Sequence, residues 1–378
     1  MAKLIDITGK ALSGEWGKED EDGTGVPVLR TTNFTNDGIV NFSNVITRDI
    51  SKNCKSEKFL RKGDIIIEKS GGSDKQPVGR VIYFEGEENK YLFNNFTGLL
   101  RVHNQKKWIP KFVFYSLFAN YKQGGTRAYE NKTTGLHNLK LDSYIQNTEI
   151  RDYAVDQQHC ICTALDQLRR IIILRKSEIN KLDELIKARF VEMFGDCKTN
   201  PKEWNTVELG NIASVGSSKR VFVEQLKDKG IPFYRGTEVG ALAEGKSIVP
   251  ELFITPEHYT ELIEFSGKPS VGDLLMPSIC PDGRIWVVNT KEPFYFKDGR
   301  VLWVHDINEG YDPVFLLFTL KDRIMTDYNS IASGTTFAEL KIFTLKQCHV
   351  FDVPLKLQKE FAAFVAQIDK SKFDNIFY

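Results

Sequence analysis

The sequence lacks most of the features that would assign a chain to a class at once. Its 378 residues contain six scattered cysteines and no Cys-x-x-Cys pair. Because a chain of this length buries an adequate core without cross-links, we expect free thiols in a reducing compartment. The longest apolar runs, such as Val314–Leu320, fall short of the ~18 residues that a membrane span needs. With no apolar leader after Met1, we expect a cytoplasmic protein with no membrane partner.

The usual signatures of catalysis are also missing. The sequence has no Gly-x-x-x-x-Gly-Lys-Ser/Thr phosphate loop, no Gly-x-Gly-x-x-Gly fingerprint and no Gly-x-Ser-x-Gly elbow. The segment His159-Cys160-x-Cys162 has no second ligand cluster, so we expect no metal. We therefore predict no catalytic residues and no cofactor bound by this chain.

The charge of the chain is nearly balanced, with 51 basic and 50 acidic residues. A nucleic-acid-binding protein usually shows a basic excess, so this balance is weak support for such a role. It still permits a local basic cleft, provided that the acidic residues lie elsewhere.

What the sequence does contain is an internal repeat. Six blocks recur in the same order at a spacing of about 200 residues, which indicates a tandem duplication. The clearest pairs are Leu4–Ile7 with Leu209–Ile212, Lys62–Ile67 with Val271–Met276, Gly79–Val81 with Gly283–Ile285, and Trp108–Leu117 with Tyr311–Leu320.

Each copy shows a mixed pattern of strands and helices. A Gly-Asp pair before three apolar residues predicts a turn into a buried strand, with a hairpin partner at Arg80–Phe84 or Arg284–Val288. Helices are expected at Lys111–Tyr121 and Asp312–Met325, each near a proline. The predicted fold class is therefore mixed α/β (α+β), with two similar domains.

A long amphipathic helix joins the copies. Apolar residues alternate at steps of 4 and 3, typical of a heptad seam, over about 38 residues or roughly 57 Å. A second helix repeats this spacing, and it is long enough to cover only about half of the first in an antiparallel coiled coil. The other half would be exposed or covered by another chain. The predicted interface residues are Ile161, Leu165, Leu168, Ile172, Ile179, Leu182, Ile186, Met193, Phe361, Phe364 and Ile368.

These patterns predict four segments. They are a first α/β domain at 1–152, a long helix at 153–195, a second α/β domain at 196–354 and a shorter helix at 355–378; the resemblance described below implies that the two domains are target-recognition domains.

Polar and basic residues recur in the loops of both copies. Arginine can bind guanine through two hydrogen bonds, asparagine can bind adenine, and Thr or Ser can contact bases or phosphates. The candidate DNA-binding residues are Arg30, Thr31, Asn33, Lys69, Ser70, Ser73, Lys75, Arg80, Lys132, Thr133, Thr134, Arg235, Thr237, Ser278, Arg284, Ser333, Thr335 and Thr336.

The chain resembles the specificity subunit of Type I restriction-modification enzymes. The strongest motifs are Phe190–Asp196, then Asn200-Pro201-x-x-Trp204 and Leu209–Ile212 at the junction, supported by the paired Gly-Asp blocks. The resemblance implies a noncatalytic subunit whose two target-recognition domains each bind one half of a split site in double-stranded DNA. It also implies binding of methyltransferase (M) and restriction (R) subunits, with S-adenosylmethionine, ATP and Mg on those partners.

One departure and two alternatives remain. Many members of this family carry a longer second helix than the one that stops here at Tyr378, so we expect either a truncated or rearranged allele or a complete short version. An adaptor that binds proteins through both domains is the main alternative function. A standalone metal-dependent nuclease is the least favoured, because Asp64 with Glu68 and Lys69 has no acidic-lysine counterpart in the second copy.

Overall fold

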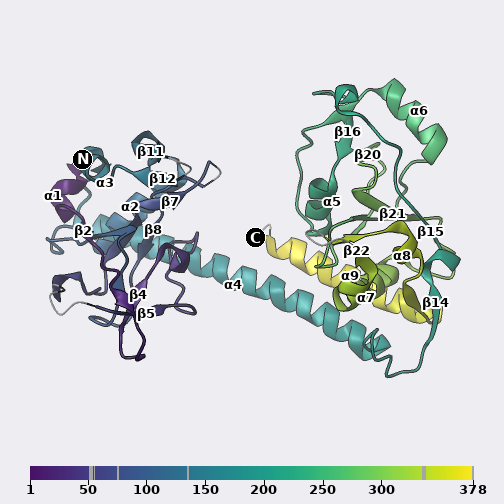
Figure 1. Cartoon of the computed structure of the whole chain (residues 1–378), viewed down its shortest axis with the longest axis horizontal. Helices are drawn as coiled ribbons and strands as arrows, with labels where there is room; N and C mark the ends of the chain where they lie inside the picture. Colours follow the sequence, from purple (N-terminus) through teal and green to yellow (C-terminus); the bar gives the residue numbers. More distant parts are fainter. Residues whose placement is uncertain (51–53, 55, 75, 134–135, 334–337, 377–378) are drawn as a thin grey trace. The chain divides into compact units, whose positions relative to one another are not determined.

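The chain folds into two compact units, Met1–Ile173 and Leu174–Tyr378. The structure, a computed structural model, describes residues 1–50, 54, 56–74, 76–133, 136–333 and 338–376; the side chains of 132, 133, 136 and 373–376 are outside the description. Figure 1 shows the elements of each unit. Within the described residues, no helix is long and apolar enough to cross a membrane.

The centre of each unit is a four-stranded antiparallel sheet with the same strand order. In the first unit the order is β2 (Leu12–Ser13), β10 (Thr97–Leu100), β6 (Ile65–Glu68), β8 (Val81–Tyr83). In the second unit it is β15 (Ser214–Gly216), β21 (Val301–His305), β18 (Leu274–Pro277), β19 (Trp286–Val287). The two Gly-Asp blocks thus begin equivalent strands, and the predicted hairpin partners pair with them.

The continuous apolar runs of β6 and β18 are explained by burial on both faces of the sheet. Ile65 and Ile67 point into a core formed with α2 (Pro110–Lys122), whereas Ile66 points into a separate core on the other face. Leu274 and Met276 likewise face a core shared with α7 (Pro313–Ile331), and the intervening leucine faces another.

The remaining sheets also correspond between the units. Each unit has a parallel strand pair with an antiparallel neighbour, a short sheet that closes its ends, and a hairpin beyond the helix. The first unit has β3 (Lys18–Glu19)-β5 (Ile46–Asp49)-β4 (Val26–Leu29)-β9 (Leu92–Phe93), β1 (Ala2–Lys3)-β13 (Glu149–Ile150) and β11 (Glu130–Thr133)-β12 (Leu136–Leu139)-β7 (Ser70–Gly72). The second has β17 (Phe253–Ile254)-β16 (Ile231–Tyr234)-β20 (Tyr295–Phe296), β14 (Asn205–Glu208)-β24 (His349–Asp352) and β22 (Ala332–Ser333)-β23 (Glu339–Leu340).

Shorter helices complete each unit, and one long helix follows each. The first unit adds α1 (Leu4–Thr8) and α3 (Leu141–Asn147), and the second adds α5 (Gly236–Ala243), α6 (Pro256–Ser266) and α8 (Ile342–Lys346). The long helices are α4 (Val155–Phe194), which begins in the first unit and ends in the second, and α9 (Leu355–Ile376). The mixed α/β prediction with two similar domains is confirmed.

A buried glutamine fixes the start of each long helix in the same way. The Gln158 Oε1 accepts from Ile109 N at 2.9 Å, and its Nε2 donates to the carbonyls of Lys107 and Tyr153, both at 2.9 Å. Both glutamines are fully buried. The identical arrangement at Gln358 shows that the recurring glutamine is a structural residue that ties the helix to its own domain.

In that second arrangement, the Gln358 Oε1 accepts from Asp312 N at 2.8 Å. Its Nε2 donates to the carbonyls of Gly310, at 3.1 Å, and Val353, at 2.8 Å. The amide therefore bridges the turn before α7 and the segment that leads into α9.

The end of α4 packs antiparallel to α9 inside the second unit. The Phe194 and Phe361 rings lie 5.7 Å apart between centroids. Earlier in α4 and later in α9, Asp183 pairs with Lys372 at 2.7 Å, so the two helices run in opposite directions. Phe190 is also buried and stacks on α7. Phe190 and Phe194, which were not among the predicted interface residues, thus join the predicted Phe361 in this contact.

The predicted seam residues differ widely in burial. Ile186 and Phe361 are buried, and Met193, Phe364 and Ile368 are partly buried in the same cluster. Ile161 is partly buried against the core of the first unit, and Leu165, Ile179 and Leu182 are half-buried. Leu168 and Ile172 are more than half exposed, at 56% and 54%. These two residues lie in the part of the long helix that the shorter second helix was expected to leave uncovered.

Candidate nucleic-acid interface

Four of the predicted residues of the second unit line one basic pocket. The pocket has a volume of about 700 Å³ and is bordered by β16, α5 and the end of β18. Its polar lining includes Arg235, Thr237, Ser278, Arg284, Lys297 and Arg300, and its walls are apolar residues such as Leu226, Leu252 and Ile279. The fold thus gathers residues from four separate parts of the sequence.

Each arginine of this pocket is oriented by a nearby carboxylate. Arg235 begins α5 and donates to Glu238 from its backbone N at 2.8 Å, while its guanidinium contacts Glu238 and, at 3.0 Å, Glu251. Burial would raise the pKa of Glu238, but the hydrogen bonds from Arg235 outweigh burial and lower that pKa to about 2. The arginine is therefore held by an ionised partner at neutral pH.

Two more arginines keep part of their guanidinium accessible. The Arg284 Nε contacts Asp282 at 2.8 Å, and its side chain is 35% exposed. Arg300 pairs with Glu339 and is 58% exposed. Ion pairs at this exposure contribute little stability, so a DNA phosphate or base can compete for these side chains.

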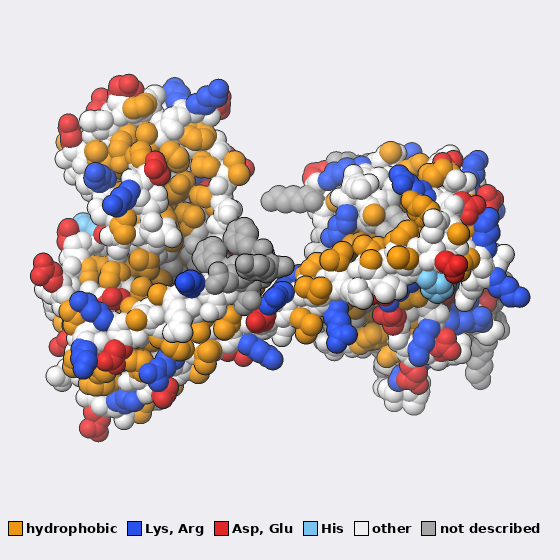
Figure 2. All heavy atoms as spheres, turned by 180° about the vertical axis from the view of Figure 1, so that it is seen from behind, with side chains coloured by type: hydrophobic (Ala, Val, Ile, Leu, Met, Phe, Trp, Pro, Cys, Tyr) orange, Lys and Arg blue, Asp and Glu red, His pale blue; other side chains and the backbone are white. Residues whose placement is uncertain are grey.

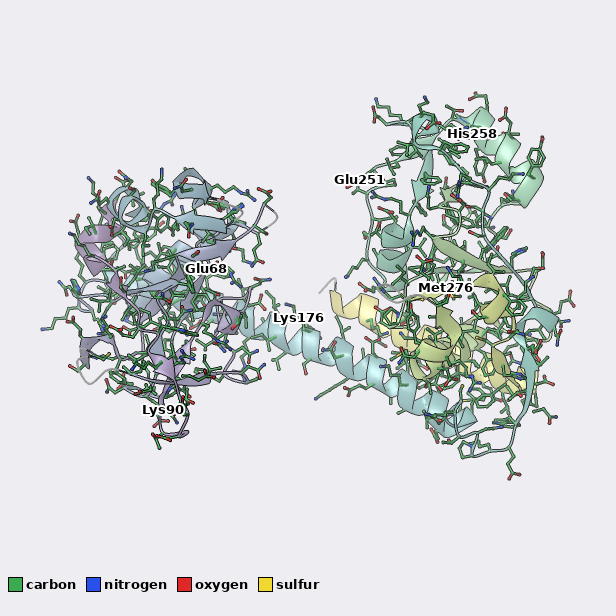
Figure 3. The ribbon with its side chains drawn as sticks, in the orientation of Figure 1. Glu68, Lys90, Lys176, Glu251, His258 and Met276 are labelled. Atoms are coloured by element: carbon green, nitrogen blue, oxygen red, sulfur yellow. The ribbon has the colours of Figure 1, made fainter. Side chains whose placement is uncertain are left out.

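The counterpart of Arg284 in the first unit is Arg80, whose guanidinium is fully bound by other groups of the chain. Arg80 forms a bidentate pair with Glu68, at 2.8 and 3.1 Å, and donates to the carbonyls of Thr31 and Phe34. The Glu68 side chain is only 1% exposed, and Figure 3 shows it inside the first unit. Because leaving a buried carboxylate without its partner is costly, Arg80 is a structural residue and we do not retain it as a base contact.

Two other predicted residues also have structural roles. Asn33 is buried, accepts from Arg30 N at 2.9 Å and donates to Asn41 O at 3.0 Å. Ser278 is 2% exposed, and its backbone N donates to Arg300 O at 2.9 Å. The Asn33 side chain is thus bound within its own loop, and Ser278 contributes little exposed surface to the pocket that it lines.

The other predicted residues of the first unit lie on neighbouring loops. Arg30, Thr31, Lys69 and Ser70 are half-buried and Ser73 is exposed. The loops are joined where Gln76 Nε2 donates to Asn36 Oδ1 at 2.9 Å. The Arg30 Nε is buried without a hydrogen-bond partner among the described residues, while its Nη2 donates to Asn44 O at 3.3 Å. Burial lowers the pKa of Lys69.

The last group of predicted DNA-binding residues has one member whose side chain the structure describes. Ser333 is exposed at the end of β22. The remaining ones lie outside the described residues or have undescribed side chains, namely Lys75, Lys132, Thr133, Thr134, Thr335 and Thr336.

The sequence reasoning missed Lys297 and Arg300. Neither residue recurs in the first unit, and strand register places Phe96 where the second unit has Arg300. A search for basic residues that differ between equivalent strands would have found it. On the face shown in Figure 2, basic and acidic side chains are interspersed over both units, so the basic pocket is a local feature.

The acidic group that suggested a nuclease has another function. Asp64 accepts from Arg101 Nε at 2.7 Å and Nη2 at 2.6 Å, and Glu68 holds Arg80. Both carboxylates are thus occupied by arginines rather than free to bind a cation. Among the described residues, no group of three or more His, Cys, Asp or Glu side chains is placed to hold a metal ion.

Comparisons with known proteins agree with the fold. Residues 2–184 match the Type I restriction modification DNA specificity domain. A crystal structure of the Type I restriction-modification S subunit from M. genitalium is 14% identical, with a TM-score of 0.55 over 99% of this chain and 90% of that chain. A solved structure from work on complex assembly and conformational transition of the type I restriction-modification system is 16% identical, with a TM-score of 0.52 and the same coverage. No curated protein matches the chain.

At these identities the two structures establish the fold, and the family model together with the recurring motifs establishes the family. The match extends over the first unit and most of α4, and the second unit repeats the first strand by strand. Residues 2–184 thus belong to the family of Type I restriction modification DNA specificity domains, and the second unit repeats their fold.

Proposed function

We propose that this specificity subunit recognises a two-part sequence in double-stranded DNA, with one half-site bound by each unit. The observation that carries the proposal is that one fold occurs twice with different exposed side chains. Arg80 is locked by Glu68, whereas its counterpart Arg284 faces a pocket, because Pro277 stands where the first unit has Glu68. Two domains that differ in this way would select different bases.

In the second unit, the proposed contacts are the accessible arginines and the exposed Thr237. An arginine that leaves its surface carboxylate can donate two hydrogen bonds to the O6 and N7 of guanine. Thr237, at the start of α5, can donate to a phosphate oxygen. In the first unit we propose Arg30, Thr31 and Lys69, together with Ser70 and Ser73. The candidates at 75, 132–134 and 335–336 stay predictions.

We further propose that partner subunits bind along the long helices. Leu168 and Ile172 offer exposed apolar surface on α4, which is typical of an interaction site. The proposed partners are the methyltransferase and restriction subunits, which would carry S-adenosylmethionine, ATP and Mg, and the proposed compartment is the cytoplasm.

The proposal is tested by co-expressing the full chain with its methyltransferase partner and determining which DNA bases become methylated. We expect a motif of two defined blocks separated by a spacer of unspecified sequence. The variant Arg284→Ala, alone or with Arg300→Ala, should relax the sequence of one block only, since each lost base contact costs about 1–3 kcal/mol of discrimination. Lys291→Ala removes an exposed charge of the same unit outside the pocket and should leave both blocks unchanged.

A continuous motif, or relaxation of both blocks by Arg284→Ala, would contradict the assignment of one half-site to each unit. Binding of the complex to DNA should also weaken steeply as salt rises, because phosphate contacts release counterions. An adaptor that binds only proteins would show no such dependence on DNA and salt.

A further inference from the structure

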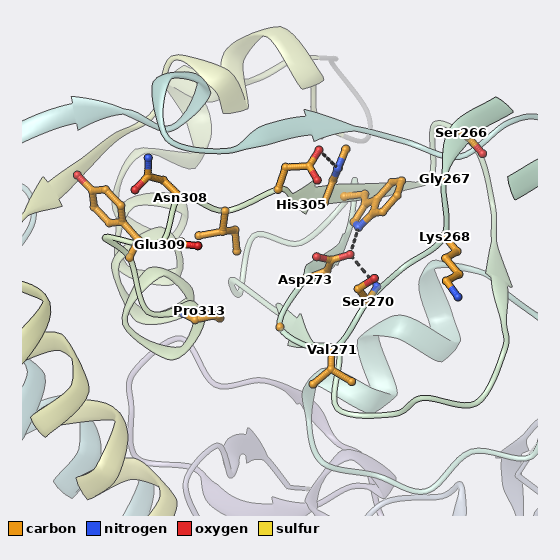
Figure 4. A pocket seen from close by; sticks show the side chains of 15 residues that line it. Ser266, Gly267, Lys268, Ser270, Val271, Asp273, His305, Asn308, Glu309 and Pro313 are labelled. Carbon is orange, nitrogen blue, oxygen red and sulfur yellow. Dashed lines mark hydrogen bonds and ion pairs between the residues drawn. The ribbon is translucent and has the colours of Figure 1, made fainter. Parts of the chain in front are cut away.

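A second cavity of the second unit lies away from the basic pocket. Its volume is about 550 Å³, and it is formed by the end of α6, the loop before β18 and the end of β21 (Figure 4). Among its lining residues are three carboxylates, Asp273, Asp306 and Glu309, against one lysine, Lys268, and one histidine. DNA contacts of the kind proposed above would not explain a cavity with this charge.

The first unit has the same loop, but an arginine fills it. The Arg101 guanidinium donates to both oxygens of Asp64, at 2.7 and 2.6 Å. It also donates to the carbonyls of Glu57, at 2.8 Å, and Phe59, at 3.0 Å. Four hydrogen bonds thus hold a guanidinium against a carboxylate that is 2% exposed.

The two loops have the same internal bonds, so their positions correspond. Arg61 N donates to Asp64 Oδ2 at 2.7 Å, and Ser270 N donates to Asp273 Oδ2 at 2.8 Å. In the reverse direction, Asp64 N donates to Arg61 O and Asp273 N donates to Ser270 O, both at 3.0 Å. Asp273 is therefore the structural equivalent of Asp64.

Strand register identifies the residue that stands in place of the arginine. The first residue of β6 pairs with Leu100, and the first residue of β18 pairs with Val304. The next residues are Arg101 and His305. The second unit therefore has a shorter side chain, without a guanidinium, at the position that fills the loop of the first unit.

His305 does not replace the arginine as the partner of the buried carboxylate. Its ring stacks on Trp303, with centroids 3.9 Å apart, and its Nδ1 pairs with Asp306 at 2.8 Å. Asp273 is 9% exposed and accepts from Trp303 Nε1 at 2.8 Å (Figure 4). Its side-chain partners among the described residues are Ser270 N and Trp303 Nε1, so neither a lysine nor an arginine is bound to it there. Burial raises the pKa of Asp273, which a bound cation would reverse.

The other acceptors of the first site also have counterparts at the cavity. Counted back from the shared Gly-Asp pair, Glu57 and Phe59 correspond to Ser266 and Lys268, and both of the latter line the cavity. The backbone positions that accept from a guanidinium in one unit thus border an open space in the other.

We propose that this cavity binds a guanidinium group, either on an arginine side chain of another protein or in a free guanidino compound. The Asp273 carboxylate would accept its hydrogen bonds, as Asp64 does from Arg101. Asp306 and Glu309 add negative charge around it. A planar guanidinium fits this role better than an ammonium, because it donates to a carboxylate and to flanking carbonyls at the same time.

The test uses the full chain labelled with ¹⁵N at its five tryptophan indoles. Trp303→Phe identifies the Trp303 signal, whose N–H donates to Asp273. Agmatine, a free guanidino compound, should shift this signal saturably with a dissociation constant on the order of millimolar. N-carbamoylputrescine, in which a neutral urea replaces the guanidinium, is the matched control and should not shift it.

Two variants test whether the guanidinium binds in this cavity. Asp273→Asn should weaken agmatine binding ~10-fold or more, since it removes a charge-assisted hydrogen bond. His305→Arg should fill the cavity as Arg101 does and abolish binding while keeping the fold. Glu292→Gln removes an exposed carboxylate outside the cavity and should bind agmatine as the parent chain does.

The source of the group is distinguished with a blocked Gly-Arg-Gly peptide and its citrulline counterpart. Tighter binding of the arginine peptide than of agmatine assigns the cavity to an arginine of a protein, and the reverse order assigns it to a free compound. The proposal is overturned if neither probe shifts the Trp303 signal, if the urea and citrulline controls shift it equally, or if Asp273→Asn leaves the affinity unchanged. None of these outcomes depends on DNA recognition.

Discussion

The buried glutamine at the start of α9 offers a sharp test of how each domain holds its long helix. Gln358→Glu changes one NH₂ group to oxygen with almost no change in volume. The bond accepted from Asp312 N, at 2.8 Å, can remain. The two bonds that Nε2 donates, to the carbonyls of Gly310 and Val353, are lost, and an oxygen then faces both.

The cost follows from the burial of this site. Gln358 is 0% exposed, so water cannot replace either lost donor. At about 1–3 kcal/mol for each buried acceptor left unsatisfied, we expect a loss of about 2–6 kcal/mol in the free energy of unfolding of the second unit at neutral pH. Gln158→Glu should have a similar effect on the first unit, because its bonds are the same.

The loss should depend on pH with a predictable sign. The new carboxyl is buried between carbonyls, so its pKa in the folded chain should lie above the ordinary value of about 4.3. A protonated acid regains one donor, and stability is therefore recovered as pH falls from the folded pKa through the unfolded one. Above the folded pKa the full loss should be present.

The assay is denaturant unfolding between pH 4 and pH 8, with hydrogen exchange of peptides to assign the transition to a unit. Gln367→Glu, an identical change on the exposed side of the same helix, is the control. The reasoning is refuted if Gln358→Glu and this control differ by less than about 0.5 kcal/mol, or if the difference between them grows as pH falls.

Three further predictions concern the cores and thiols. Arg101→Ala should destabilise the first unit by about 3–5 kcal/mol, because it leaves the buried Asp64 carboxylate unpaired; added guanidine hydrochloride at low concentration should restore part of this loss in thermal unfolding. Phe190→Ala should cost about 3–5 kcal/mol in denaturant unfolding, whereas the same change at its exposed neighbour Val191 should cost little. Of the cysteines, Cys160 is the exposed one and should react first with a thiol reagent at pH 8; loss of the fast phase in Cys160→Ser would verify this, and an unchanged fast phase would contradict it.

The duplication, the fold class and the long helix are predictable from the sequence alone. The repeat is detectable because equivalent strands need the same residues, a Gly-Asp turn and then an apolar run buried on both faces of a sheet. The long helix predicted at 153–195 corresponds to α4, which runs from Val155 to Phe194. The helix is predictable because its periodicity and its terminating glycine are local signals.

Which of the recurring residues can reach a ligand depends on contacts that form only in the folded chain. Arg80 and Arg284 occupy equivalent positions in the two copies. The buried Glu68 binds Arg80, whereas Pro277 stands at the matching position of the second unit and cannot bind Arg284 in this way. Asp64 and Asp273 diverge for the same reason, since one pairs with Arg101 and the other borders an open cavity. A recurring residue identifies a position in a fold. Its role depends on partners that are distant in sequence, such as Arg101, 37 residues from Asp64.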